Sequence, residues 1–106
     1  MVKRGDVWLV NLAPTVGSEI KKTRPCVVIS PPELHDYLRT VLIAPMTTGS
    51  HPAPYRITVR HGGRVGLILL DQIRAVDKVR LVKRSGSISP GVLKATLTAL
   101  GEVFTE

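Results

Sequence analysis

The sequence predicts a mainly β protein, with one small, strongly curved sheet or barrel followed by a C-terminal helix. Short apolar runs recur along the 106 residues and are interrupted by Pro, Gly and Ser, which is the usual pattern of short strands and turns. Aromatic residues make up only 4% of the chain, so the core must depend on Val, Leu and Ile, many of them β-branched and suited to strands. A helical apolar stripe appears only near the end of the chain.

The first half of the chain contains three predicted strands. Gly5–Leu12 (GDVWLVNL) is the first strand, and the apolar runs Cys26–Ser30 (CVVIS) and Val41–Met46 (VLIAPM) are typical of buried strands. Pro31–Leu38 is expected to form a short helical turn, because Pro-Pro-Glu suits a helix start. Thr47–Pro54 (TTGSHPAP) has the composition of a loop.

The second half repeats this pattern. Tyr55–Arg60 (YRITVR) alternates as a half-exposed strand does, and His61–Arg64 (HGGR) contains a Gly-Gly turn signal. Val65–Leu70 (VGLILL) is predicted to be another buried strand. Asp71–Asp77 continues with partial alternation, and Lys78–Ile88 is expected to hold one more short strand.

The predicted helix begins at Ser89-Pro90, where Ser is the N-cap and Pro occupies the first turn. Its apolar side chains fall on one stripe, at spacings of four, three and four residues: Leu93, Leu97, Leu100 and Phe104. The stripe is expected to pack on the sheet, and the alternative is that it binds a partner helix.

Length and composition indicate one packed domain that spans residues 1–106. Fifteen Lys and Arg residues oppose eight Asp and Glu residues, which gives a formal net charge of +7. This charge fits a soluble basic surface, and it equally fits a surface that binds a polyanion or an acidic protein. The basic residues are spread along the chain, so no linear patch separates the two interpretations.

Several classes of protein are disfavoured. The lone cysteine, Cys26, excludes an intrachain disulfide, and its apolar surroundings indicate an inert buried thiol. No apolar run reaches the length of about 18 residues that a membrane span needs, and the N-terminus lacks the apolar segment of a signal peptide. We therefore expect a cytoplasmic protein that does not enter a membrane.

Common catalytic motifs are missing from the sequence: it has no GxGxxG, Walker loop, HExxH or GxSxG. The three histidines, His35, His51 and His61, lie in separate polar segments without metal-ligand spacing. Each is expected to be a solvated loop residue. The sequence thus predicts neither a metal site nor a cofactor.

Polar residues at two strand boundaries are the remaining candidates for chemistry. Glu19 and Arg24 flank a turn-rich loop, and Pro25 favours an extended backbone at Arg24. Thr47 and Thr48 follow a buried strand. One interpretation is purely structural: Glu19 and Arg24 form a surface salt bridge, and the two threonines cap loop backbone groups. They could instead form a phosphate site, because an arginine fork and hydroxyls suit phosphate oxygens and a carboxylate can accept a proton.

Five segments follow one another along the chain: RGDVWLVNL, PTVGSE, TRPCVVIS, IAPMTTG and LLDQIR with VDKVRL. In this order and spacing they resemble the MazF/PemK family of type II toxin–antitoxin toxins. The resemblance runs from about Lys3 to Leu81 and continues in kind through the predicted helix. It implies an SH3-like small β barrel with a C-terminal helix, the MazF/PemK/CcdB-type toxin fold, usually assembled as a homodimer.

The resemblance also implies an activity and the residues that carry it. The activity is metal-independent, sequence-specific cleavage of single-stranded mRNA. By position, the catalytic residues of the family match Arg24, Thr47 and Glu19. The expected RNA-binding residues are Gly17, Ser18, Lys21, Lys22, Thr48, Asp71 and Gln72. The segment Ile20–Thr23 departs from many Gly- or Gln-rich relatives and predicts a more basic loop, which leaves the cleavage sequence open.

In this mechanism the 2′-hydroxyl of the RNA is the nucleophile, and the products carry a 2′,3′-cyclic phosphate (or 3′-phosphate) and a 5′-hydroxyl. The expected partners are single-stranded RNA, a second copy of the chain, and a cognate antitoxin whose acidic disordered segment folds on the basic surface. Two alternatives stay open: a non-catalytic SH3-like nucleic-acid-binding module, and a gyrase-poisoning toxin of the same fold.

Overall fold

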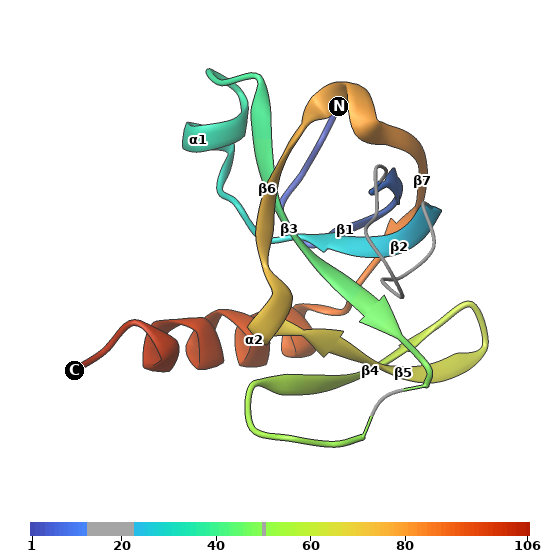
Figure 1. Ribbon diagram of the computed structural model, residues 1–106, viewed down its shortest axis with the longest axis vertical. Helices are drawn as coiled ribbons and strands as arrows, with labels where there is room; N and C mark the ends of the chain where they lie inside the picture. Colours follow the sequence, from blue (N-terminus) through green and yellow to red (C-terminus); the bar gives the residue numbers. More distant parts are fainter. Residues whose placement is uncertain (13–22, 50) are drawn as a thin grey trace.

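The computed structural model describes residues 1–12, 23–49 and 51–106 (Figure 1). The strands, in chain order, are β1 (Asp6–Asn11), β2 (Thr23–Val28), β3 (Thr40–Thr47), β4 (Arg56–His61), β5 (Arg64–Leu69), β6 (Arg74–Asp77) and β7 (Leu81–Ser87). The helical elements are α1 (Pro32–His35), the 3-10 turns η1 (Leu70–Gln72) and η2 (Lys78–Arg80), and α2 (Pro90–Val103).

The strands form one antiparallel sheet in the order β4-β5-β3-β2-β1-β7, and β6 also pairs with β3. The central strand β3 pairs with β6 along Thr40–Ile43 and with β5 at Met46 and Thr47. Figure 1 shows β3 crossing the molecule from the region of α1 to the β4–β5 hairpin, while the sheet curls around it. The predicted class, a strongly curved β structure with a C-terminal helix, is confirmed.

The strand boundaries differ from the expected ones in two places that matter. Strand β2 begins at Thr23 rather than Cys26, so Arg24 and Pro25 belong to the strand. Strand β3 includes Thr47, which was expected to open a loop. Both candidate residues are therefore held by sheet structure at strand ends.

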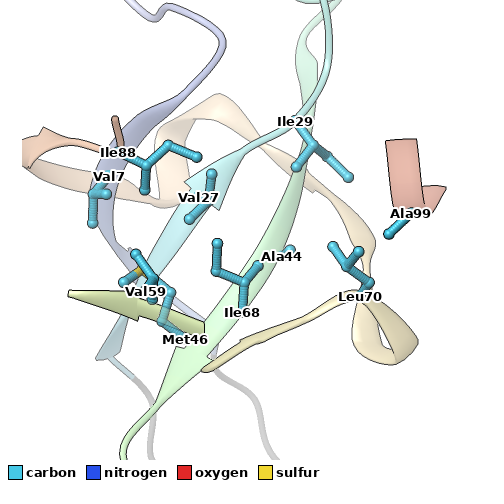
Figure 2. Close-up of a cluster of buried hydrophobic side chains, with 10 residues drawn as sticks. All are labelled: Val7, Val27, Ile29, Ala44, Met46, Val59, Ile68, Leu70, Ile88 and Ala99. Atoms are coloured by element: carbon cyan, nitrogen blue, oxygen red, sulfur yellow. The ribbon is translucent and has the colours of Figure 1, made fainter. Parts of the chain in front are cut away.

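The core consists of two clusters of buried aliphatic side chains. Figure 2 shows the first cluster: Val7, Val27, Ile29, Ala44, Met46, Val59, Ile68, Leu70, Ile88 and Ala99. The second contains Val10, Leu12, Cys26, Val28, Val41, Ile43 and Val76. Because successive side chains of a strand point to opposite faces, β2 sends Val27 into one cluster and Cys26 and Val28 into the other. Burial on both faces explains the continuous apolar run in this strand.

Helix α2 begins as expected, since Ser89 Oγ accepts a hydrogen bond of 3.2 Å from the backbone N–H of Val92. Its buried residues, however, are Thr96 and Ala99, whose small side chains let the helix lie close to the sheet. Leu93 and Leu100 pack beside them. The predicted stripe is wrong at Phe104, which lies just beyond the helix and is 74% exposed.

His35 was expected to be solvated, and this prediction is wrong because the single turn of α1 buries its side chain completely. Its Nε2–H donates to the carbonyl of Val2 at 3.1 Å, so its Nδ1 accepts from Ser30 Oγ at 2.9 Å. Ser30 Oγ in turn accepts from Leu42 N–H at 3.2 Å. The imidazole thus connects the N-terminal segment, α1 and β3 through satisfied hydrogen bonds.

Across the described ranges, no helix combines the length and apolarity that a membrane crossing requires.

Candidate active site

A cleft of about 320 Å³ lies where the ends of β2 and β3 meet the β4–β5 hairpin. We call it the Arg24 cleft. Its lining residues are Thr23, Arg24, Pro25, Met46, Thr47, Thr48, Val59, His61, Arg64 and Gly66. The structure thus brings together three of the residues expected to act on RNA, Arg24, Thr47 and Thr48, from two separate segments of the chain.

The register of β2 and β3 explains why Arg24 and Thr47 share this cleft. Cys26 pairs with Pro45, so continuing the register by two residues along each strand sets Arg24 opposite Thr47. Pro25 has no backbone N–H to donate, and the pairing of the two strands ends at Cys26. Arg24 still pairs with Val10 of β1, but it lies beyond the last residue that pairs with β3, and its side chain lines the cleft.

Among the described residues, Arg24 makes one side-chain hydrogen bond. Its Nη1 donates to the carbonyl of Met46 at 3.4 Å, which is a long hydrogen bond. Within the described ranges, no carboxylate forms an ion pair with Arg24. A partly buried arginine in this state suits an anion such as a phosphate, whose oxygens match the planar fork.

Thr47 presents a hydroxyl with a defined orientation. Its Oγ1 accepts a hydrogen bond of 3.2 Å from Gly49 N–H. The hydroxyl also carries a proton, which it can donate to an acceptor such as a phosphoryl oxygen. Thr48 follows it and is exposed.

Gly66 fixes the position of Thr47 and was missed in the sequence. A Cβ at Gly66 would lie 2.6 Å from the carbonyl oxygen of Thr47, closer than such atoms can approach. Only glycine lets β5 approach the end of β3 in this way. The available signal was an isolated glycine inside the apolar run VGLILL, which often marks a close backbone approach.

His61 and Arg64 also line the cleft, and the sequence analysis did not assign them to it. The expectation of a solvated loop histidine is wrong for His61, which ends β4, is partly buried and faces Arg64 across the hairpin. The Gly-Gly turn was the signal, because residues that flank a tight two-residue turn pair with each other. His51, by contrast, is exposed as expected.

Asp71 and Gln72 lie in η1 and are not part of the cleft lining. Both carboxylate oxygens of Asp71 accept hydrogen bonds from Arg56, at 3.1 Å from Nε and 3.0 Å from Nη2. This hydrogen bonding lowers the pKa of Asp71 and raises that of Arg56. An RNA contact at Asp71 and Gln72 stays a prediction.

The other predicted site residues all belong to the segment between β1 and β2. Glu19, the expected base, and the RNA-binding candidates Gly17, Ser18, Lys21 and Lys22 lie outside the described residues.

Cys26 is buried beside Arg24, and desolvation raises the pKa of its thiol to about 12, although the charges of Arg24 and Arg74 oppose the shift. A thiol in this state does not act as a nucleophile. Among the residues that the structure describes, no three His, Cys, Asp or Glu side chains gather in a group that could hold a metal ion.

The fold is a small, strongly curled β sheet with a C-terminal helix, and its cleft holds an arginine and a threonine hydroxyl. Residues 3–104 match the family described as PemK-like, MazF-like toxins of type II toxin–antitoxin systems. The chain therefore belongs to the PemK/MazF toxin family.

Two relatives named endoribonucleases support this placement. The chain is 29% identical to endoribonuclease PemK of Escherichia coli over 98% of its length and 83% of the relative. It is 37% identical to endoribonuclease MazF of Staphylococcus epidermidis over 79% of its length and 75% of the relative.

Solved structures share the fold. MazF from Deinococcus radiodurans superposes with a TM-score of 0.81 at 24% identity, covering 96% of this chain and 94% of that one. A mycobacterial endoribonuclease in complex with its cognate antitoxin gives a TM-score of 0.80 at 19% identity, covering 96% of this chain and 93% of that one.

Proposed function

We propose that this protein is a sequence-specific, metal-independent endoribonuclease that cleaves single-stranded mRNA, and that it is the toxin of a type II toxin–antitoxin system. The observation that carries the proposal is that Arg24 and Thr47 line one cleft and that both side chains carry hydrogen-bond donors. The relatives named endoribonucleases support the choice of RNA as substrate.

The proposed reaction uses the RNA's own 2′-hydroxyl. Its oxygen attacks the adjacent phosphorus, a P–O2′ bond forms, and the P–O5′ bond breaks. The 2′-hydroxyl proton passes to a base, which we assign to Glu19, and the departing 5′ oxygen takes up a proton. The products are a 2′,3′-cyclic phosphate, or the 3′-phosphate after hydrolysis, and a 5′-hydroxyl.

Arg24 and Thr47 stabilise the negative charge that builds on the phosphoryl oxygens in the transition state. Donors held in place before the reaction have no reorganisation cost, and losing one such donor reduces the rate by about 10²–10³-fold in other enzymes. Sheet structure holds both residues, since Arg24 lies in β2 and Thr47 ends β3.

We assign RNA binding to Gly17, Ser18, Lys21, Lys22, Thr48, Asp71 and Gln72. Lys21 and Lys22 would contact the phosphates of the backbone. The net charge of +7 favours a polyanion, so binding should weaken steeply as salt rises. Bases of single-stranded RNA would be splayed out and recognised on their edges.

We further propose that the toxin is a cytoplasmic homodimer controlled by a cognate antitoxin. A dimer provides a longer groove than one small barrel. The solved complex of a mycobacterial endoribonuclease with its cognate antitoxin supports the proposal that this protein, too, binds an antitoxin. An acidic segment that folds on the basic surface would block the groove.

Incubation of the purified protein with a long RNA in EDTA tests the activity. Discrete cuts without a divalent metal are the expected result. Intact RNA with a gel shift would instead indicate a non-catalytic RNA-binding module. Intact RNA together with inhibited DNA supercoiling would indicate a gyrase poison of the same fold.

A further inference from the structure

The departing 5′ oxygen needs a proton donor, and Arg24 is poorly suited to this task because a guanidinium does not give up its proton in proteins. Among the described residues that line the Arg24 cleft, His61 is the one imidazole, the side chain that most often serves as a general acid in enzymes. We infer that His61 is the general acid that protonates the leaving 5′ oxygen. This role rests on the proposed RNA cleavage.

The imidazole of His61 is held at the cleft by a contact from a distant strand. Its Nε2 lies 2.8 Å from the hydroxyl oxygen of Ser85 in β7, a partner 24 residues away in the sequence. Gly86 leaves room for the ring, since a Cβ there would lie 3.1 Å from His61 Cε1. Ring position is therefore fixed by tertiary structure and not by the hairpin alone.

Among the described residues, only one of the two ring nitrogens of His61 has a hydrogen-bond partner. In the imidazolium form both nitrogens donate, so Nε2–H donates to Ser85 Oγ. No described residue forms a hydrogen bond with Nδ1. Nδ1–H is then the proton that moves: the Nδ1–H bond breaks, an O5′–H bond forms, and the electron pair of the P–O5′ bond leaves with the oxygen.

The described side chains around His61 are cationic or neutral, which suits the binding of an anionic substrate. Arg24 of β2 and Arg64 of β5 line the same cleft, Ser85 of β7 is neutral, and the described lining includes no carboxylate. A phosphodiester bound in this cleft would lie among cationic and neutral side chains, where no described carboxylate repels it.

The competing explanation is that His61 only fastens the β4–β5 hairpin to β7 through Ser85. His61→Gln separates the two roles, because the glutamine amide can still bond to Ser85 but cannot transfer a proton. His61→Asn is a second variant with a shorter amide, in case the first does not fold. Thermal unfolding would establish that each variant is folded.

The decisive experiment compares two RNAs under single-turnover conditions, after the cleavage site has been mapped. One carries the ordinary 5′ oxygen at that site, and the other carries a bridging 5′ sulfur, which leaves as a thiolate without needing a proton. We expect His61→Gln to slow cleavage of the oxygen substrate by about 10²–10⁴-fold and to cut the sulfur substrate at nearly the wild-type rate. Arg24→Ala, the matched control, should be slow on both.

Wild-type cleavage of the oxygen substrate by folded His61→Gln would overturn the role. Equal slowing on both substrates would overturn it too, since it would indicate a structural function for His61. If the wild-type protein cut neither RNA, the proposed nuclease function would itself be refuted, and the role of His61 with it.

Discussion

Arg24 and Arg56 both belong to strands of the same sheet, but their surroundings differ sharply. Arg56 makes two hydrogen bonds, of 3.1 and 3.0 Å, to the carboxylate of Asp71. In the described part of the molecule, Arg24 makes one hydrogen bond of 3.4 Å to a backbone carbonyl and no ion pair. A carboxylate occupies the guanidinium of Arg56, whereas no described carboxylate pairs with the guanidinium of Arg24.

This difference distinguishes an arginine proposed to act on substrate from an arginine that only pairs with a carboxylate of the protein. A charge count gives both arginines equal weight, although only Arg24 lines a cleft that also contains a threonine hydroxyl and an imidazole. Arginine–carboxylate pairs at the surface contribute little to stability. We therefore expect the removal of Arg24 to affect catalysis and the disruption of the Arg56–Asp71 pair to affect stability slightly.

The largest expected effect is that of Arg24→Ala, which should reduce RNA cleavage by about 10³-fold or more because a charged transition-state donor is lost. The matched control is Arg39→Ala. It removes the same charge just before the start of β3, a strand length of about 20 Å or more from Thr47. Rates on one short RNA measure both variants, and equal loss in the two would show that only net charge matters.

A similar effect is expected at Thr47. Thr47→Ala should slow cleavage by about 10²–10³-fold because one donor is missing, while Thr47→Ser keeps the hydroxyl and should retain most of the activity. Single-turnover rates on the same RNA provide the comparison. Comparable loss in the alanine and serine variants would indicate that the methyl group, and not the hydroxyl, matters.

A smaller effect on activity, accompanied by lower stability, is expected for Gly66→Ala. The added methyl group collides with the carbonyl of Thr47, so the ends of β3 and β5 must separate at a cost of about 1–3 kcal/mol in the free energy of unfolding. Gly91→Ala in α2 is the control, because beyond its chain neighbours and the backbone of its own helix no described atom lies within 4 Å of its Cβ position. Chemical denaturation of both proteins measures the difference, and equal stabilities would contradict the close approach.

The smallest effect is expected at the Arg56–Asp71 pair. Hydrogen bonding from Arg56 lowers the pKa of Asp71 below its ordinary value of 3.8, so the carboxylate stabilises the folded protein above that pH. This contribution is lost as the pH falls through the lowered pKa. Asp71→Asn should therefore lower the Tm slightly at pH 7 and leave it unchanged in strong acid. A Tm difference that persisted in acid would argue against the ion pair as its source.

Local patterns in the sequence predict the strands and the N-cap of α2, because alternation and capping depend on neighbouring residues. The motif order points to Arg24 and Thr47, which the structure brings into one cleft, while their catalytic role stays a prediction. The roles of Gly66 and His61 depend instead on contacts between β3 and β5 and between β4 and β7, which no short segment reveals. His35 is missed for the same reason, since its hydrogen bonds extend to Val2.

The most direct test of the central claim uses an RNA in which the 2′-hydroxyl at the mapped cleavage site is replaced by hydrogen. In EDTA, the wild-type protein should cut the unmodified RNA to a 2′,3′-cyclic phosphate and a 5′-hydroxyl and leave the modified RNA intact at that site. Cleavage of the modified RNA at the same bond would contradict the proposed mechanism, because the nucleophile would then come from somewhere other than the substrate.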